Sequence, residues 1–341
     1  MARLTRVEQQ ARTREAVLAA ARAEFAEHGY AAAKVDRIAD RAELTRGAVY
    51  SNFPGKRALY LAVLAAMAAE DAPAAAVSAP RTAEDALTAF ARAWLERLPP
   101  AGGSAPGGRL RLRSLAGVLD EGVLAPIARL EALALATGLE SCGGPGRRLR
   151  LAELALTLLH GSGLLAELVP GFGDPTDRAR ACGHLARLDL ADTWTPPHRP
   201  APARAVHEIL APLDAPADLV GGSRVDLGAD GVTAVLGVPR LAAAEDAYRA
   251  AGPGGQATVI VPAAGEDADL LRLRLTDLAA CLRAVFPAAA LRRLHVVLDD
   301  GTLAAAIGIE DAGAETEAAL RVSDGIVTAR ASGPGAGRAL A

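Results

Sequence analysis

The sequence predicts a mainly α-helical chain that ends in an α/β domain. Ala and Leu, which favour helix, occur in long stretches through the first 195 residues. After a proline-rich stretch at residues 195–202, short β-branched runs alternate with helical patterns. A chain of 341 residues is long enough for two or three domains with separate cores. The domains that we expect are residues 1–72, 73–195 and 203–341, with a linker at 196–202.

The first 72 residues have the pattern of short helices joined by tight turns. Apolar residues recur at helical spacing in the first helix, and Gly29 follows it as a C-terminal cap. The turn Glu43-Leu44 separates two short helices, and Thr45 is placed to cap the second of them. Pro54-Gly55 then breaks the chain before a fourth helix. The predicted helices are residues 8–27, 35–42, 46–52 and 56–71.

Two short helices that meet at a tight turn can place the second one in the major groove of DNA. Gly47 and Ala48 are small, so the amino end of that helix can approach a duplex closely. Thr45 and the free N–H groups beside it can bind a phosphate, and Arg46 can reach a guanine edge. The residues that we expect to contact DNA are Lys34, Thr45, Arg46, Gly47, Ala48, Tyr50, Ser51, Asn52 and Lys56.

The charge distribution agrees with a DNA-facing amino end. Residues 1–60 hold 11 Lys/Arg and 7 Asp/Glu, a net charge of +4. The whole chain has a net charge of −3, so residues 61–341 carry −7. The only two lysines, Lys34 and Lys56, both lie in this segment. Residues 203–341 hold 18 Asp/Glu against 12 Arg, so we expect no nucleic-acid binding there.

Residues 10–70, which we call the head, closely resemble the TetR family of bacterial transcriptional regulators. The resemblance depends on Phe25-x-x-x-Gly29-Tyr30, Ile38-Ala39-x-x-Ala42, Arg46-Gly47-Ala48-Val49-Tyr50-x-x-Phe53 and Lys56-x-x-Leu59. It implies DNA contacts from Thr45, Arg46, Gly47, Tyr50, Asn52 and Lys56. One departure is Lys34, because the family usually has Ser or Thr there, which caps the next helix and touches phosphate.

The resemblance also implies a function for residues 73–195. They are expected to bind an unknown small-molecule effector and to form a homodimer through helices at about 147–168 and 174–190, so that the chain represses at a palindromic operator. Helical patterns also cover residues 82–98, 109–119 and 123–138. The candidate ligand-pocket residues are Phe90, Trp94, Leu115, His160 and Phe172.

Residues 203–341 have the pattern of an α/β domain. Strands are predicted at residues 232–238, 257–261 and 294–298, a helix at 269–286, and a hairpin at 319–331 around Asp324-Gly325. This order resembles a thioredoxin-like fold, and residues 295–308 are similar to a late segment of peroxiredoxins. The reactive thiol of that fold follows the strand matched to 257–261, but residues 262–268 contain no cysteine, which favours a degenerate domain.

Other features limit the classes of function. Cys142, Cys182 and Cys281 are sparse and odd in number, which is typical of a reducing cytoplasm rather than of a disulfide framework. We expect no metal, no cofactor, no membrane-spanning helix and no enzymatic activity. One alternative is a redox-responsive regulator or thiol enzyme that uses the α/β domain. Another is a sensor whose α/β domain, rather than the helical body, captures the effector.

Overall fold

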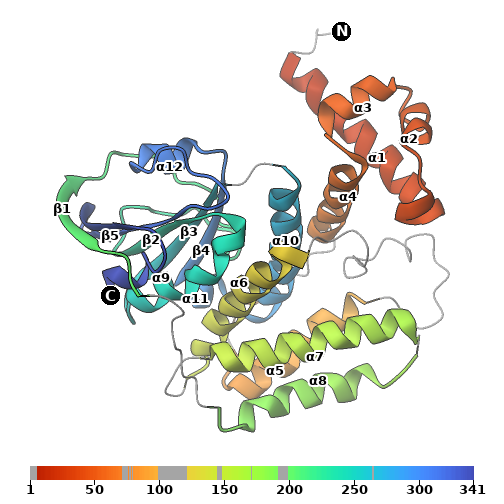
Figure 1. Cartoon of the computed structure of the whole chain (residues 1–341). Helices are drawn as coiled ribbons and strands as arrows, with labels where there is room; N and C mark the ends of the chain where they lie inside the picture. The colour runs from red at the N-terminus through yellow and green to blue at the C-terminus, as the bar shows by residue number, and fades with distance from the viewer. Residues whose placement is uncertain are drawn as a thin grey trace.

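The structure is a computed structural model, and it describes residues 6–70, 76, 78, 80–98, 121–143, 148–169, 171–190, 199–262 and 265–341. Helices make up the part before residue 190, and a mixed six-stranded sheet with its own helices follows residue 203 (Figure 1). The prediction of a helical chain followed by an α/β part is therefore confirmed. The likeness of the α/β part to thioredoxin stays a prediction.

The helices of the first part lie close to their predicted positions. They are α1 (Arg6–Ala32), α2 (Val35–Arg41), α3 (Arg46–Asn52), α4 (Lys56–Glu70), α5 (Ala83–Glu96), α6 (Glu121–Glu140), α7 (Leu149–Leu168), α8 (Pro175–His184) and the 3-10 turn η1 (Leu185–Arg187). Helix α1 continues beyond residue 27, but Gly29 has a φ of 71° and kinks it where a cap was expected. The predicted helix at 109–119 lies outside the described residues.

The head, α1 to α4, closes around a core that the apolar spacing predicted. Phe25, Ile38, Val49 and Phe53 are each at most 3% exposed. Glu43 turns the chain between α2 and α3 with a positive φ of 57°.

The helix predicted at 174–190 is shorter than expected. Helix α8 ends at His184, η1 ends at Arg187, and α8 packs mainly along α5 with a smaller contact to α7. A Cβ on Gly183 would lie 2.0 Å from Oγ1 of Thr88, so only glycine permits this close approach. Arg187 in η1 donates two hydrogen bonds, of 2.6 and 2.9 Å, to the carboxylate of Glu84 on α5.

Among the described residues, two helices are long and apolar enough to cross a membrane by length and composition, α6 over Gly122–Glu140 and α7 over Leu149–Ala166. Within the protein, 67% of the α6 segment and 44% of the α7 segment are buried. The burial of α6 is that of a core helix. Helix α7 keeps an exposed apolar face that includes Leu164 and Leu168.

The sheet follows the helical part. Its strands are β1 (Ala203–Ile209), β2 (Gly231–Leu236), β3 (Gln256–Pro262), β4 (Leu294–Asp299), β5 (Glu317–Ser323) and β6 (Ile326–Ser332), in the order β1-β6-β5-β2-β3-β4. Strands β2, β3 and β4 are parallel, and the β5–β6 hairpin pairs with β2. Asp324 and Gly325 both have positive φ, as the predicted type I′ turn requires.

One strand of the sheet was not predicted. Strand β1 was missed because it is an edge strand with mostly exposed residues and no continuous apolar run.

The helices of this part are η2 (Val238–Ala243), α9 (Ala244–Ala250), α10 (Glu266–Val285), α11 (Ala288–Leu291), α12 (Thr302–Ala306) and η3 (Arg338–Leu340). Helix α10 packs against α4, α5 and α6, and it lies between the sheet and the helical part (Figure 1). Ion pairs cross these contacts at Arg57–Glu266 (2.8 Å), Arg97–Asp277 (2.7 Å) and Arg274–Glu131 (2.7 Å). The hydrophobic core is therefore continuous across the expected boundary at residue 203.

Candidate nucleic-acid interface

Helix α3 begins at a side-chain cap. Thr45 has an extended backbone, and its Oγ1 accepts a hydrogen bond of 3.2 Å from the N–H of Ala48. Of the residues predicted to contact DNA, the exposed ones are Lys34, Thr45, Arg46, Gly47, Tyr50 and Ser51, and the half-buried ones are Ala48, Asn52 and Lys56. Because Val49 is buried, α3 packs through one side and leaves the other side open.

Gly47 is not required by the packing of the protein itself. A Cβ added there would have one neighbour within 4 Å, Oγ1 of Thr45 at 3.8 Å, which is an ordinary contact. The residue also has no left-handed backbone conformation. Glycine inside a helix costs roughly 0.5–1 kcal/mol relative to alanine. The glycine thus weakens α3 without serving the fold, as expected where an outside partner must approach the backbone.

Arg46 is held along the exposed side of α3. Its guanidinium lies 5.4 Å from the ring centroid of Tyr50 and 3.3 Å from the carboxylate of Asp36 on α2. The hydrogen bond to the Tyr50 hydroxyl, followed by the charge of Asp36, raises the pKa of Arg46. These exposed contacts limit the conformations of the side chain without burying it.

Two other polar side chains of α3 turn back onto its own backbone. Ser51 Oγ and Asn52 Nδ2 each donate a hydrogen bond of 2.9 Å to the carbonyl of Ala48. The carbonyl of Asn52 in turn accepts from Arg14 of α1 at 3.0 Å, and that guanidinium lies 4.2 Å from the ring centroid of Phe53. Arg14 is therefore a basic residue beside α3 that sequence analysis missed. Its contact with Asn52 is 38 residues away in the chain, so local spacing gave no signal.

The two lysines differ in their environment. Nζ of Lys56 donates to the carbonyl of Ala31 at 3.1 Å and lies 4.8 Å from the ring centroid of Tyr30, and burial lowers the pKa of Lys56. Lys34 is exposed and, as expected, makes no side-chain cap for α2. The sequence predicted that the Lys56 ammonium is available to DNA, but in the structure this group already donates a hydrogen bond to the end of α1.

The comparisons with known proteins identify this head. Residues 17–63 match the model of bacterial regulatory proteins of the tetR family. The head at residues 17–63 is therefore a DNA-binding domain of the tetR type. No curated protein matches the sequence.

Solved structures with some similarity include a TetR transcriptional regulator from Rhodococcus sp. RHA1, with 18% identity, 54% of this chain and 99% of that chain covered, and a TM-score of 0.35. Another is NalD, the secondary repressor of the MexAB-OprM multidrug efflux pump in Pseudomonas aeruginosa, with 25% identity, 55% of this chain and 100% of that chain covered, and a TM-score of 0.34.

A buried carboxylate supports the TetR head from behind. Glu24 is fully buried, and its Oε1 accepts from the N–H of Lys34 at 3.1 Å and from Nε of Arg37 at 2.7 Å. Burial alone would raise the pKa of Glu24, but these two hydrogen bonds bring it below its ordinary value. Glu24 thus ties α1 to the start of α2, where Lys34 supplies no cap of its own.

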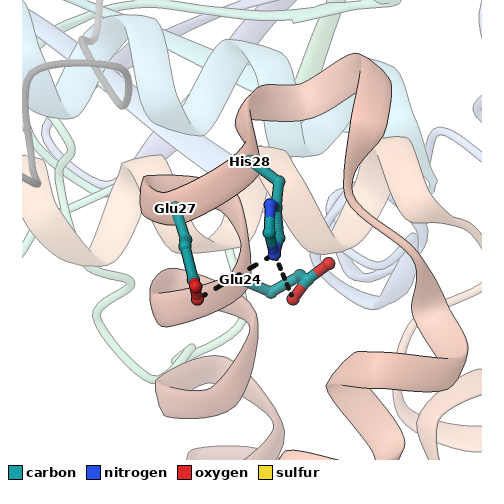
Figure 2. A group of neighbouring side chains, drawn as sticks. All are labelled: Glu24, Glu27 and His28. Carbon is teal, nitrogen blue, oxygen red and sulfur yellow. Dashed lines mark ion pairs between the residues drawn. The ribbon is translucent and has the colours of Figure 1, made fainter.

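Figure 2 shows Glu24 with Glu27 and His28, whose ligand-type atoms lie within 4.8 Å of one another. Arg41 contacts both carboxylates, with its Nε 3.5 Å from Glu24 and its Nη2 bonded to Glu27. Arginines therefore already supply positive charge to this cluster. We assign it to the packing of α1 against α2 rather than to metal binding.

Only some of the predicted pocket residues of the helical body lie next to one another. Phe90 and Trp94 on α5 are buried with ring centroids 5.9 Å apart, and the His160 ring meets Trp94 edge-on at 5.1 Å. Phe172 was wrongly grouped with them, because it is 59% exposed. Leu115 lies outside the described residues.

Sequence analysis also missed the buried charges beside this group. Arg274 of α10 donates to Glu131 of α6 at 2.7 and 2.8 Å and lies 3.1 Å from Nε2 of His160. The first two residues are separated by 143 positions. Only the packing of α10 into the body brings them together.

The cysteines give no support to a redox function. Cys142, Cys182 and Cys281 are all buried. Burial raises the pKa of Cys182 to about 12 and also raises the pKa of Cys142. A reactive thiol needs exposure and a stabilised thiolate, so none of the three is placed for that chemistry.

Proposed function

We propose that this chain is a TetR-family, DNA-binding transcriptional regulator of the cytoplasm, and that α3 enters the major groove. The observation that carries the proposal is Gly47, which is exposed, destabilises α3 and meets no neighbour that requires it. Arg46 and Tyr50 stand beside it on the open side, where they can reach base edges. Lys34 and Arg14 extend this surface towards the phosphates.

We propose further that the chain works as a homodimer on a palindromic operator. Helix α7 and the turn after it carry large exposed apolar residues: Leu154 (40%), Leu164 (55%), Leu165 (39%), Leu168 (69%), Val169 (49%) and Phe172 (59%). A contiguous apolar face of this kind marks an interaction site. A two-fold partner on it would present two heads, and half-sites one turn of DNA apart, about 34 Å, would be read together.

The proposed dimer surface is narrower than the sequence indicated. Helix α8 is engaged with α5, so α7 is left as the main contributor. Repression is proposed because a dimer that occupies an operator blocks the promoter. Release by an effector would follow if the effector prefers the conformation whose heads do not match the operator.

The DNA that co-purifies with the protein tests the proposal. The DNA bound to the wild type and the DNA bound to the Arg46→Ala variant are both sequenced. Only the fragments from the wild type should share an inverted repeat. Arg204→Ala, on β1 far along the chain from the head, is the matched control and should recover the same fragments as the wild type. Recovery of unrelated DNA by all three proteins would contradict specific operator binding.

A further inference from the structure

Two adjoining cavities open at the carboxyl ends of the parallel strands. One, of about 590 Å³, lies beside β4 and α12, and the other, of about 270 Å³, lies over the ends of β2, β3 and β4. Both are lined by Asp299 and Asp300, the residues where β4 ends. We call the two together the β4 cleft. In open α/β sheets, ligands bind beyond the carboxyl ends of the strands.

The lining of the β4 cleft is amphipathic. Leu213, Val297 and Leu303 form apolar wall in the larger cavity, and Asp214 and Asp300 bring carboxylates to it. Asp299 is already occupied, because it accepts the N–H groups of Leu303 and Ala304 at 3.0 and 2.8 Å. Asp300 also caps the following turn, because its Oδ1 accepts from the N–H and the hydroxyl of Thr302 at 3.1 and 2.6 Å. The cleft thus offers an apolar surface with Asp214 and the second oxygen of Asp300 near its rim.

The backbone of β4 adds hydrogen-bonding capacity. Ala257 of β3 donates to the carbonyl of Arg293, which fixes the alternation along the β3–β4 ladder. Val296 faces away from β3, since its carbonyl accepts from Leu219 at 2.9 Å. Two residues on, Leu298 faces the same way, and it lines the larger cavity. Its N–H and C=O are therefore directed to the side on which a ligand would lie.

The cleft is connected to the head, α1 to α4, through α10. Asp267 and Arg272 of α10 line the smaller and the larger cavity, respectively. The residue before Asp267 is Glu266, whose carboxylate lies 2.8 Å from Arg57 in the first turn of α4. A Cβ on Gly55 would lie 3.5 Å from the same carboxylate, so Glu266 also touches the turn between α3 and α4.

The rest of α10 is fixed to the helical body. The buried pairs Arg97–Asp277 and Arg274–Glu131 hold its middle against α5 and α6. Displacement at the cleft is therefore expected at the amino end of α10, where the Arg57–Glu266 pair is more exposed, with side chains 24% and 34% accessible. That is the end that touches the head.

We infer that the β4 cleft is an effector site and that the first turn of α10 transmits its occupancy to α3 and α4. This inference deepens the proposed function, since it assigns the ligand response to the α/β part rather than to the helical body. The ligand class that fits is a small amphipathic molecule with a cationic group, because apolar side chains line the larger cavity and its three carboxylates outnumber its one cation, Arg272.

The test uses a covalent substitute for the ligand in the full-length chain. Ala306 is exposed, lines the larger cavity and can be changed to Cys, while the three native cysteines are buried and should not react. The A306C thiol is labelled with 2-(trimethylammonium)ethyl methanethiosulfonate, which places a cationic group in the cleft. The matched control is A205C on β1, at the opposite edge of the sheet.

Labelled A306C should bind operator DNA at least about 5-fold differently from unlabelled A306C, a typical size for allosteric coupling. Labelled A205C should not change. Amide hydrogen exchange of residues 46–60 should change with the same selectivity, and the E266Q substitution should reduce both effects. Hexylamine should protect A306C from labelling better than hexanoate does.

The outcomes separate the two proposals. If the wild type binds no specific DNA, the proposed regulator function fails, whereas the exchange experiment still reports on the coupling. If DNA binding is specific but neither affinity nor exchange responds to the label at A306C, the inference is overturned. An equal response at A205C would overturn it too, because the effect would not belong to the cleft. Equal protection by hexylamine and hexanoate would overturn the assignment of the ligand class.

Discussion

At the residue scale, the head combines groups that serve the fold with groups that do not. Glu24 links α1 to α2, Thr45 caps α3, and Val49 packs in the core. Gly47 has no such partner, and Tyr50 is 40% exposed. The separation between these two kinds of residue leads to different expectations for stability and for binding.

Replacement of Gly47 by alanine should stabilise the protein and weaken DNA binding. Alanine removes the entropic cost of glycine in a helix, which is about 0.5–1 kcal/mol, and the added Cβ meets no clash within the chain. Urea unfolding and operator titration check the two effects. Unchanged operator affinity in the stabilised variant would show that no close partner approaches α3 at this residue.

Replacement of Arg46 by alanine should cost about 1–3 kcal/mol of specific binding and relax base preference at one position of the operator. Lys34→Ala should instead weaken binding to all sequences and reduce the salt dependence, because its exposed side chain can only neutralise phosphate. Competition titrations against single-base operator variants, at several salt concentrations, separate these effects. Identical behaviour of the two variants would remove the assigned roles.

At the element scale, α1 and α2 are joined by one buried carboxylate rather than by a local cap. Helix α2 begins at Lys34, which provides no side-chain bond, and the missing acceptor comes from Glu24 on α1. The tie therefore depends on an ionised side chain inside the head.

Replacement of Glu24 by glutamine should destabilise the head by about 1–3 kcal/mol at neutral pH, because a charge-assisted hydrogen bond to Arg37 is lost. The pKa of Glu24 is lowered in the folded protein from an ordinary value of 4.5, so its stabilising contribution is present above that pH. It is lost as the pH falls through the lower, folded-state pKa. Urea unfolding at pH 7 and at pH 3.5 should show a smaller difference between the two proteins at the acidic pH, and a constant difference would contradict the assignment.

At the scale of the whole molecule, the α/β part is packed into the helical part rather than tethered to it. Helix α10 fills the space between α4, α5 and α6, so removal of residues 203–341 would expose apolar faces on all three. A truncated chain is for that reason a poor test of effector binding. Point variants in the full-length chain are the better route.

The exposed face of α7 leads to a prediction about assembly. Leu168→Glu places a charge on a residue that is 69% exposed, so the monomer should fold while the proposed dimer dissociates. Sedimentation should show a monomer, and operator affinity should fall by at least about 10-fold because one head cannot span two half-sites. Leu188→Glu, at a residue 51% exposed beyond η1, is the control and should remain dimeric. A dimeric Leu168→Glu protein would exclude this face.

The sequence by itself determined the local features of this protein. The spacing of apolar residues predicted the head core and α1 to α4, Thr45 identified the start of α3, and Asp324-Gly325 identified the hairpin turn, because each depends on neighbours a few positions away. Phe172 was misplaced because an apolar residue reads alike whether it faces a core or a partner.

Only the tertiary structure decided how these elements meet. The packing of α8 on α5, the insertion of α10 beside α4 and the buried pair of Arg274 with Glu131 join residues about 100 to 210 positions apart. Such contacts depend on the complementary shapes and charges of surfaces that form only when the chain has folded, so no periodicity in the sequence encodes them.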